Sequence, residues 1–512
     1  MRTTRTILFV LTIAAVVFWG FPSAHGSPVL IKMELTAEPD YQKANQLNID
    51  VYHKFPEKNG EGVLVIAEFE ESNLSALDNA GLIYEVIDEE PWTESYYLIS
   101  ESKGVEKVDL SEYGKVLVSS GNERFMKISD ENARSLAANG YYIVKVFRHR
   151  LPLKYKSQEI SLPKGSLYYP DIDSLLSLIS QDSLYAWDLR LQNFQTRYSY
   201  SDSIVKARDW LYDKFDSFGI DSLWLHYYNY DSPQWNVVAT VVGTSQPDKV
   251  IVVGGHYDSV VYGSGTNPYV WAPGADDNGT GTVATLEMAR IIAENPLPVT
   301  VIFVPFPQEE QGLIGSDYFC HWLYYHYVDV HFMINSDMIA HSVDADQDVV
   351  IYAASSALDF VNIMMDMANT YTYLNPAYGG QSSGSDHYSF YQWGYDAVFA
   401  SEGDFFYNGW HKNYDVVDSL NFPYMKEVVK MCLATLVTVA QDIGYMMGDP
   451  TWDGVIDLAD VLFLINHLYK GGPAPDPMEI GDVTCDGEVD FEDVLFLINY
   501  LYKGGPAPPP SC

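Results

Sequence analysis

The middle of the chain carries a histidine and several carboxylates that close or directly follow apolar segments. Neutral imidazole and ionised carboxylate are the side chains that bind zinc, and they are spread over more than 150 residues. A strand that ends in such a residue delivers it to the edge of a sheet. We therefore predict one metal site assembled from distant positions. The candidate positions are His256, Asp258, Asp276, Asp277, Glu309, Glu310, Asp337 and His411.

This set of side chains is sufficient for a pair of metal ions. Two ions a few ångströms apart need a bridging carboxylate, one histidine and one or two carboxylates on each ion, and an open position for water. The candidate positions supply all of these groups. Neutral imidazoles would also keep the site from becoming too anionic, while the carboxylates would offset the charge of the metals.

Five segments around these positions resemble a known family. In order and approximate spacing they are similar to the zinc-dependent exopeptidases of the bacterial leucyl aminopeptidase type, which are related to the transferrin-receptor and glutamate-carboxypeptidase proteins. The resemblance covers roughly residues 171–446. It departs after the last histidine, where the family usually has Thr-Pro and this chain has Lys-Asn. The segments are Gly255-His256-Tyr257-Asp258-Ser259, Pro273 to Gly281, Gln308 to Ser316, Asn335 to Ile339, and Trp410 to Asp415.

The resemblance implies a role for each ligand. Asp277 would bridge two zinc ions. His256 and Asp337 would complete one zinc site, and Glu310 and His411 would complete the other. The resemblance thus implies a zinc-dependent exopeptidase, and we expect an aminopeptidase that removes N-terminal residues, with two Zn²⁺ as cofactors and peptides or proteins as substrates.

Three further carboxylates lie next to the proposed ligands in the sequence. Asp258 would orient His256 from behind the ligand shell. Glu309, next to a ligand, would be the general base that takes a proton from the attacking water and gives it to the departing amine. Asp276 competes with Asp277 as the bridging residue, and the Asn-Gly-Thr-Gly turn that follows Asp277 favours the latter. The family also implies a cis peptide bond after the bridging residue.

Several alternatives stay open at this point. Carboxypeptidases and dipeptidases share the ligands, glutaminyl cyclases share the fold with one zinc, and some relatives are catalytically silent binding or scaffold proteins. Gly380-Gln381-Ser382-Ser383-Gly384 also fits the nucleophile pattern of serine hydrolases, with Asp386 and His387 close behind. That pattern needs a strand directly before the serine, and we do not expect a strand over residues 373–379.

The C-terminal region contains a second kind of metal chemistry. A twelve-residue acidic loop followed by an apolar helix recurs 33 residues later, with glycine at position 6 of each loop. Hard oxygen ligands at positions 1, 3, 5, 7, 9 and 12 select calcium. One helix follows each loop, so the pair resembles a dockerin repeat, which implies two Ca²⁺ and a cohesin-like partner. The positions are Asp449, Thr451, Asp453, Val455, Asp457 and Asp460, and then Asp482, Thr484, Asp486, Glu488, Asp490 and Asp493.

Strands must hold the central ligands, and the sequence predicts them. Apolar, β-branched runs at 235–242, 250–253 and 299–304 alternate with a helical segment at 282–294. This alternation predicts an α/β domain with a largely buried sheet that helices cover on both faces. The family resemblance implies that this is the central mixed sheet of the zinc exopeptidase fold. We assign residues 171–446 to it and expect helices over residues 171–219.

The flanking regions predict further domains. Residues 28–150 show two similar strand–helix–strand passages and form a small α+β accessory or propeptide-like domain. Residues 151–170 contain three prolines and read as a linker. Residues 447–512 form the small all-α calcium-binding module, in which the helices at 461–468 and 494–501 are expected to pack on each other.

Composition and the N-terminus indicate where the protein works. A basic start leads into an apolar run at 7–18 and a small-residue stretch ending at Gly26, which predicts a signal peptide over residues 1–26. The formal charge of −39 argues against nucleic acid as a partner, and no membrane span is expected. We therefore expect a secreted or extracellular protein, with tethering to the cell surface through the C-terminal module as an option.

The four cysteines fit this compartment. Their spacing argues against a thiolate metal site, and an exported protein can form a disulfide between Cys485 and Cys512. Cys320 and Cys432 lie in apolar surroundings and are expected to be buried thiols.

Overall fold

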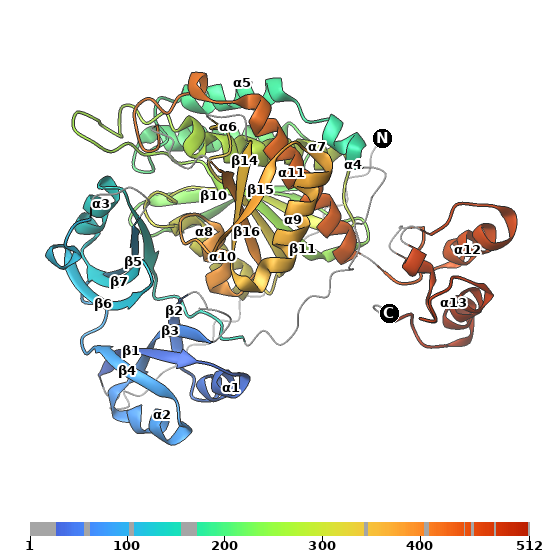
Figure 1. Ribbon diagram of the computed structural model, residues 1–512, viewed down its shortest axis with the longest axis horizontal. Coiled ribbons are helices and arrows are strands. Elements are labelled where there is room, and N and C mark those ends of the chain that lie inside the picture. The colour runs from blue at the N-terminus through green and yellow to red at the C-terminus, as the bar shows by residue number, and fades with distance from the viewer. Residues whose placement is uncertain are drawn as a thin grey trace.

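The computed structural model describes most of the chain (Figure 1). The expected signal peptide, most of the expected linker, the proposed calcium ligand Asp453 and the cysteine Cys512 lie outside the described residues. The described residues are 27–55, 62–101, 107–154, 172–342, 347–403, 409–444, 446–451, 455–475 and 478–509.

An eight-stranded mixed sheet forms the centre of the molecule, as the sequence predicts. Its strand order is β15-β14-β16-β13-β11-β12-β10-β9, and the four strands β16, β13, β11 and β12 run parallel. The strands are β9 (Ser222–Asn229), β10 (Pro233–Val241), β11 (Gln246–His256), β12 (Val299–Phe306), β13 (Asp329–Ser336), β14 (Asp348–Ala353), β15 (Asn375–Gly380) and β16 (Ala397–Glu402).

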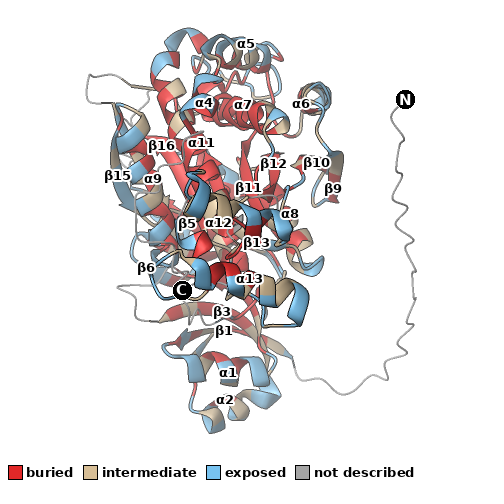
Figure 2. Ribbon diagram, turned by 90° about the vertical axis from the view of Figure 1, so that its right-hand side faces the viewer, coloured by how far each residue is buried: buried red, intermediate tan, exposed pale blue. Residues whose placement is uncertain are grey.

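The central strand β11 is buried on both faces. Ile251 and Val253 belong to one apolar cluster and Val250 and Val252 to another, because successive side chains of a strand point to opposite faces. Figure 2 shows the resulting continuous buried layer between the helices. A near-unbroken apolar run is therefore what a strand in this position requires.

Helices cover both faces of this sheet. One layer contains α4 to α7, α9 and α11, and the other contains α8 and α10. The helices expected over residues 171–219 are α4, α5 and α6. The bounds are α4 (Ile172–Ser177), α5 (Gln181–Gln192), α6 (Asp202–Asp216), α7 (Gly281–Glu294), α8 (Ile314–Tyr325), α9 (Leu358–Tyr371), α10 (His387–Trp393) and α11 (Phe422–Gly444).

The N-terminal region forms two four-stranded antiparallel sheets with the same strand order. The first orders its strands β2-β3-β1-β4 and the second β6-β7-β5-β8, so each is a split βαβ arrangement. The elements are β1 (Pro28–Leu35), α1 (Glu38–Gln46), β2 (Asp50–Lys54), β3 (Val63–Glu70), α2 (Leu74–Ala80), β4 (Ile83–Asp88), then β5 (Ser95–Glu101), β6 (Gly114–Ser120), β7 (Glu123–Ile128), α3 (Asp130–Ala138) and β8 (Tyr141–Val146).

This arrangement differs in one respect from the two passages expected there. The first passage corresponds to β3, α2 and β4, and α2 ends at Gly81 in a left-handed conformation. In the second passage, β7 lies between the expected strand β6 and helix α3. Its charged residues Arg124 and Lys127 interrupt the apolar run, which hides the strand from a search for apolar segments.

The C-terminal region contains α12 (Leu458–Lys470) and α13 (Phe491–Lys503), which lie apart from the large sheet in Figure 1. The two helices pack on each other through Val461, Leu464, Val494 and Leu497, which confirms the expected contact. Cys485 is disulfide-bonded, whereas Cys320 and Cys432 are free and buried. Among the described residues, no helix is long and apolar enough to cross a membrane.

One local expectation was wrong. The segment before the serine-hydrolase pattern is a strand, β15 (Asn375–Gly380), which pairs with β14 at the edge of the sheet. Its residues include Pro376 and two glycines, which are poor strand formers. A strand edge tolerates them because one side of β15 has no strand partner in the described sheet.

Phe360 tests how the helix layer is attached to the sheet. Its side chain is 2% exposed, and its ring stacks on Phe332 of β13 with centroids 4.1 Å apart. Phe360→Ala should lower the free energy of unfolding by about 3–5 kcal/mol, because it leaves a cavity between α9 and the sheet. Denaturant unfolding followed by fluorescence measures the change.

Leu358→Ala on the same helix is the matched control. Leu358 is 38% exposed, so its truncation should change the free energy of unfolding by no more than about 0.5 kcal/mol. Equal losses for the two variants would contradict the packing described for α9.

Candidate metal centre

The parallel strands deliver the candidate residues to one edge of the sheet. β11 ends at His256, and β13 ends directly before Asp337. β12 ends at Phe306 and is followed by the loop that carries Glu309 and Glu310. The carboxyl ends of parallel strands are where sites form in open α/β sheets.

A tight loop before α7 brings the bridging candidate to the same place. The peptide bond between Asp277 and Asn278 is cis. The Asn278 side-chain amide donates to the carbonyl oxygen of Ser336 at 2.9 Å and accepts from the Gly281 N–H at 2.8 Å. A Cβ at Gly281 would lie 1.9 Å from the Ser336 carbonyl oxygen, so only glycine fits this approach.

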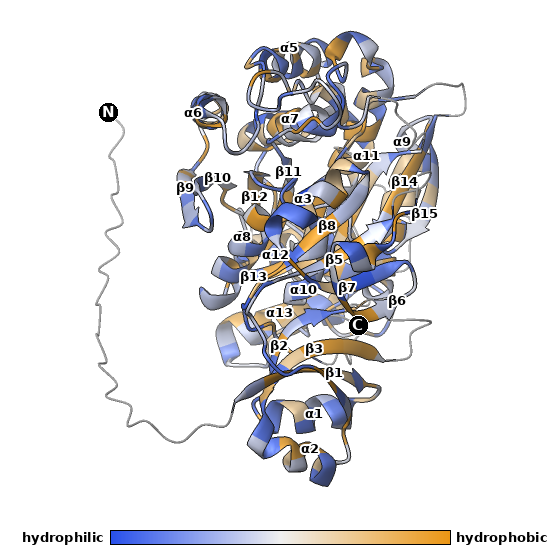
Figure 3. Ribbon diagram, turned by 90° about the vertical axis from the view of Figure 1, so that its left-hand side faces the viewer, coloured by the Kyte–Doolittle hydropathy of each residue, from blue (hydrophilic) through white to orange (hydrophobic). Residues whose placement is uncertain are grey.

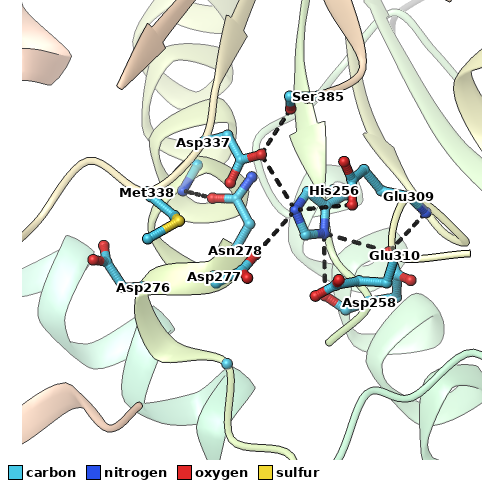
Figure 4. A network of polar contacts seen from close by, with 12 residues as sticks. His256, Asp258, Asp276, Asp277, Asn278, Glu309, Glu310, Asp337, Met338 and Ser385 are labelled. Carbon is cyan, nitrogen blue, oxygen red and sulfur yellow. Dashed lines mark hydrogen bonds and ion pairs between the residues drawn. The ribbon is translucent and has the colours of Figure 1, made fainter. Parts of the chain in front are cut away.

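Three carboxylates converge on His256, as Figure 4 shows. Its Nε2 atom lies 3.3 Å from Asp277 Oδ1, 3.5 Å from Asp337 Oδ2 and 3.7 Å from Glu309 Oε2. The imidazole is 1% exposed.

A second histidine, His411, lies next to the other carboxylate oxygen of Asp277. His411 Nε2 lies 3.2 Å from Asp277 Oδ2 and 2.8 Å from Glu310 Oε2. Each oxygen of Asp277 therefore faces a different histidine. This is the arrangement that a carboxylate bridging two ions requires.

The orphaned atoms of these residues fit bound cations. Glu310 Oε1 and Asp337 Oδ1 are buried and have no hydrogen-bond partner among the described residues. Two overlapping groups also have ligand atoms within 4.8 Å of one another, and they share His256. Buried carboxylate oxygens without a donor are costly unless a cation satisfies them. The groups are His256, Glu309 and Asp337, and His256, Asp277 and Glu310.

Burial and mutual repulsion perturb the acids and bases of the centre. Burial raises the pKa of Glu309 well above its ordinary value, and the carboxylates of Glu310 and Asp337 add to this against the opposing effect of His256. Burial raises the pKa of Glu310 to about 7. Burial lowers the pKa of His411, but Glu310 and Asp277 outweigh it and raise that pKa to about 10. Protons and cations compete for these atoms, so metal binding would release protons.

Asp258 supports the centre from behind. Its Oδ1 lies 3.4 Å from His256 Nδ1 and accepts from the Glu309 N–H at 3.2 Å. Its Oδ2 accepts from the Ser199 hydroxyl at 3.0 Å. One carboxylate thus holds both a ligand candidate and the backbone of the base candidate. Asp258 is fully buried.

Asp276 points away from the centre in Figure 4. Its Oδ1 accepts from the Ala340 N–H at 3.1 Å and from the Thr280 hydroxyl at 3.3 Å. Asp277, not Asp276, lies between the two histidines. This geometry supports the choice that the Asn-Gly-Thr-Gly turn suggested.

Two supporting residues were not singled out from the sequence. Asp415 accepts the N–H groups of Asp276 at 2.9 Å and Asp277 at 3.1 Å, and Ser385 donates to Asp337 Oδ2 at 2.7 Å. The spacing of Asp415, four residues after His411, is the available signal for the first. For Ser385 the available signal is that Ser385-Asp386-His387 resembles a loop beside the substrate pocket in the exopeptidase family.

The serine-hydrolase alternative lacks the required contacts. His387 Nε2 lies 3.0 Å from the carbonyl oxygen of Ser382, not from its hydroxyl. The Ser382 hydroxyl accepts instead from the Gly384 N–H at 3.1 Å. A nucleophilic serine needs its base on the hydroxyl.

A cavity of about 460 Å³ opens over the metal centre. The metal-ligand candidates line its floor, and Met338, Val350, Tyr352 and Phe399 line an apolar side. Residues of β5, β7 and β8 in the N-terminal region also line it, Tyr142 among them. Such a volume is typical of a small-ligand site.

The C-terminal loops bring several of their predicted calcium ligands together. The Thr484 hydroxyl donates to Asp493 Oδ1 at 3.0 Å, and Asp482 accepts from the N–H groups of Asp486 and Gly487 at 3.1 and 2.8 Å. Gly487, at position 6, has φ +91°. Thr451 donates to Asp460 at 2.7 Å in the first loop, where Asp457 caps α12 as Asp490 caps α13. Val455 and Glu488 lie at the positions whose carbonyl groups would bind.

Two family descriptions match the chain. Residues 236–436 match Peptidase family M28, and residues 447–502 match the Dockerin type I domain. The first range contains every zinc-ligand candidate, and the second contains both acidic loops.

The chain is also similar to individual proteins whose names or structures are known. The chain is 27% identical to a probable aminopeptidase of Saccharomyces cerevisiae over 62% of this chain and 90% of that protein. It is 27% identical to leucine aminopeptidase 1 of Ajellomyces capsulatus over 64% of this chain and 90% of that protein. The crystal structure of LapB from Legionella pneumophila has the same fold, with a TM-score of 0.55 and 20% identity over 68% of this chain and all of that chain.

Asp258→Asn tests the support behind His256. The amide keeps the shape but removes the charge that faces Nδ1, so zinc affinity should fall about 10–100-fold. Competition with chelators of graded strength, read as zinc content, measures the change. Asp213→Asn, exposed on α6, is the matched control and should keep wild-type affinity. Equal affinities for the two variants would contradict a supporting role for Asp258.

Proposed function

Since the chain carries a peptidase family M28 domain followed by a dockerin type I domain, we propose that it is an extracellular aminopeptidase that uses two zinc ions. It would remove N-terminal residues from peptides. The family and the aminopeptidase relatives support a zinc-dependent exopeptidase. The position of Asp277, with one oxygen toward His256 and the other toward His411, is the observation that carries the two-zinc proposal.

Five residues would hold the zinc ions. Asp277 would bridge them, His256 and Asp337 would complete one site, and Glu310 and His411 would complete the other. When bound, zinc would polarise the scissile carbonyl group and lower the pKa of a water molecule at the site.

Glu309 would act as the general base. Its carboxylate lies beside His256, and Glu309 is not one of the five proposed zinc ligands. The hydrogen bond from its N–H to Asp258 fixes its backbone. Burial raises the pKa of Glu309, which favours uptake of a proton from the attacking water, and the same carboxyl group would then pass that proton to the leaving amine.

The other activities of this fold have less support. A glutaminyl cyclase needs one zinc, whereas His256 with Asp337 provides a second set of ligands beside the first. A silent binding protein would not need an intact Glu309 next to a complete ligand set. Carboxypeptidase and dipeptidase action remain the alternatives within the same chemistry.

Glu309→Gln tests the base. The amide cannot accept the proton, so turnover of leucyl p-nitroanilide should fall by about 10²–10⁴-fold while zinc content stays at the wild-type value. Initial rates and metal analysis on the same sample provide the two readouts. Unchanged turnover would remove Glu309 from this role.

Removal of the metal with a chelator tests whether the activity depends on zinc. Dialysis of the wild-type protein against a strong chelator should abolish amino-acid release, and added zinc should restore it. Gln308→Glu in the same loop is an unsuitable control, because the Gln308 side-chain amide donates a hydrogen bond to Asp231 at 2.9 Å. Activity that persists after complete metal removal would defeat the zinc mechanism.

The C-terminal module would bind two calcium ions and a cohesin-like partner. The two acidic loops and the dockerin match support this assignment. Large apolar side chains remain exposed on its helices, among them Leu462 at 46% and Leu495 at 40%. Single exposed apolar residues are ordinary, but a pair at equivalent positions of a repeat suits a protein partner. The predicted signal peptide would bring the protein to the compartment where such partners occur.

Calcium titration tests the loops. The wild-type protein should bind two calcium ions at the C-terminal module, and Asp493→Asn should remove one of them, because position 12 supplies the strongest ligand of the second loop. Isothermal titration of the zinc-loaded full chain measures the stoichiometry. Glu492→Gln, adjacent but exposed and outside the ligand positions, should keep two. A stoichiometry that Asp493→Asn does not change would contradict the loop assignment.

A further inference from the structure

The second N-terminal sheet, β5 to β8, forms part of the wall of the cavity over the metal centre. Ser100, Glu123 and Tyr142 of this sheet line the same cavity as His256 and Glu309. These side chains precede the first metal-ligand candidate, His256, by 114 to 156 residues in the chain. The cavity is therefore a composite of two structural units. Figure 3 looks onto the side of the molecule where this sheet lies.

The sheet is joined directly to the loop that carries the base candidate. The Lys145 N–H of β8 donates to the Gly312 carbonyl oxygen at 3.2 Å. Gly312 has φ +111°, and a Cβ there would lie 2.8 Å from Lys145 N. The loop after Glu310 thus has the one residue type that lets β8 approach so closely.

Apolar and polar contacts extend this attachment. Val144 and Val146 of β8 share a buried cluster with Leu313 and Tyr388 of the peptidase domain. In the first N-terminal sheet, the backbone of Lys54 makes two hydrogen bonds with the Gln392 side chain, at 2.9 and 2.7 Å.

A polar contact between His149 and Asp317 completes the interface beyond β8. His149 Nδ1 lies 2.6 Å from Asp317 Oδ2, with both side chains largely buried. The interface between the N-terminal sheets and the peptidase domain therefore has a buried apolar core and paired polar groups, as specific protein interfaces do.

Tyr142 of this sheet lies next to Trp410, which in turn stacks on the ligand candidate His411. Its ring lies 5.6 Å from that of Trp410, and the Trp410 ring stacks on His411 at 4.1 Å. Its Cε1 atom would lie 3.3 Å from a Cβ placed on Gly384. Burial raises the pKa of the Tyr142 hydroxyl well above its ordinary value, and Asp337 and Asp277 add to this, so the hydroxyl stays protonated.

We propose that Tyr142 is a specificity-determining residue that forms the wall of the pocket for the first side chain of the substrate. This inference rests on the proposed function, since the residue being released would lie beside the metal centre. The apolar residues Val350, Tyr352 and Phe399 line the same cavity and would form the rest of the pocket. The N-terminal region would then contribute directly to substrate binding.

The size of the cavity favours this role over that of an inhibitory cover. About 460 Å³ remains over the metal centre with the N-terminal sheets in place. An inhibitory segment is expected to fill the site with its own side chains, whereas a wall leaves room for a ligand.

Tyr142→Ala and Tyr142→Phe in the full chain test the proposal. The alanine variant enlarges the pocket, so the ratio of kcat/KM for phenylalanyl over alanyl p-nitroanilide should rise about tenfold. The phenylalanine variant keeps the ring and should hold the ratio within about twofold of wild type. Tyr113→Ala is the matched control, because Tyr113 lies in the same N-terminal unit outside the cavity lining and should leave the ratio unchanged. Zinc content is measured for every variant.

The outcomes separate this inference from the proposed function. Wild-type protein that releases no amino acid from any substrate, with zinc bound, would reject the proposed aminopeptidase. An active wild type whose substrate ratio does not respond to Tyr142→Ala would overturn only the role of Tyr142. A uniform rise in turnover on all substrates would also overturn it, because that is the behaviour of an inhibitory cover.

Discussion

The concentration of buried negative charge at one edge of the sheet governs the rest of the structure. Carboxylates of Asp258, Asp277, Glu309, Glu310 and Asp337 lie within one site and are almost fully enclosed. Such a group is stable only with cations, histidines and backbone N–H groups arranged around it. The surrounding loops provide this arrangement. Their positions are fixed by buried hydrogen bonds that have no other evident purpose.

Arg197 illustrates how those loops are held. It is fully buried and donates to the carbonyl oxygens of Tyr257, Pro273 and Gly274, at 2.7, 2.7 and 2.6 Å. One guanidinium group thus ties the chain after His256 to the loop that carries Asp277. Arginine suits this task because its rigid fork of donors matches several acceptors at once. The ligand geometry therefore depends on a residue that contacts no candidate ligand side chain in the described hydrogen bonds.

The sequence predicted the parts of the molecule that follow from strand ends and family motifs. The mixed sheet and its helices could be read from apolar runs, and the convergence of His256 and Asp337 follows from parallel strands that end at one edge. The sequence could not predict Tyr142, because its contact with the site depends on how two units pack. β7 and β15 were missed for a local reason. Their charged residues, glycines and proline hide strands that pairing with neighbours stabilises.

The two partners of the hydrogen bond between Lys145 and Gly312 are synthesised at different times. β8 ends at residue 146, so 312 − 146 = 166 residues are synthesised between that strand and its partner carbonyl. At about 5–20 residues per second, the sheet has roughly 8–33 s on the ribosome before the loop emerges. The chain of the N-terminal sheets is therefore available before the loop of Glu309 and Glu310 emerges. The proposed wall of the substrate pocket is thus made before most of the metal ligands that it borders.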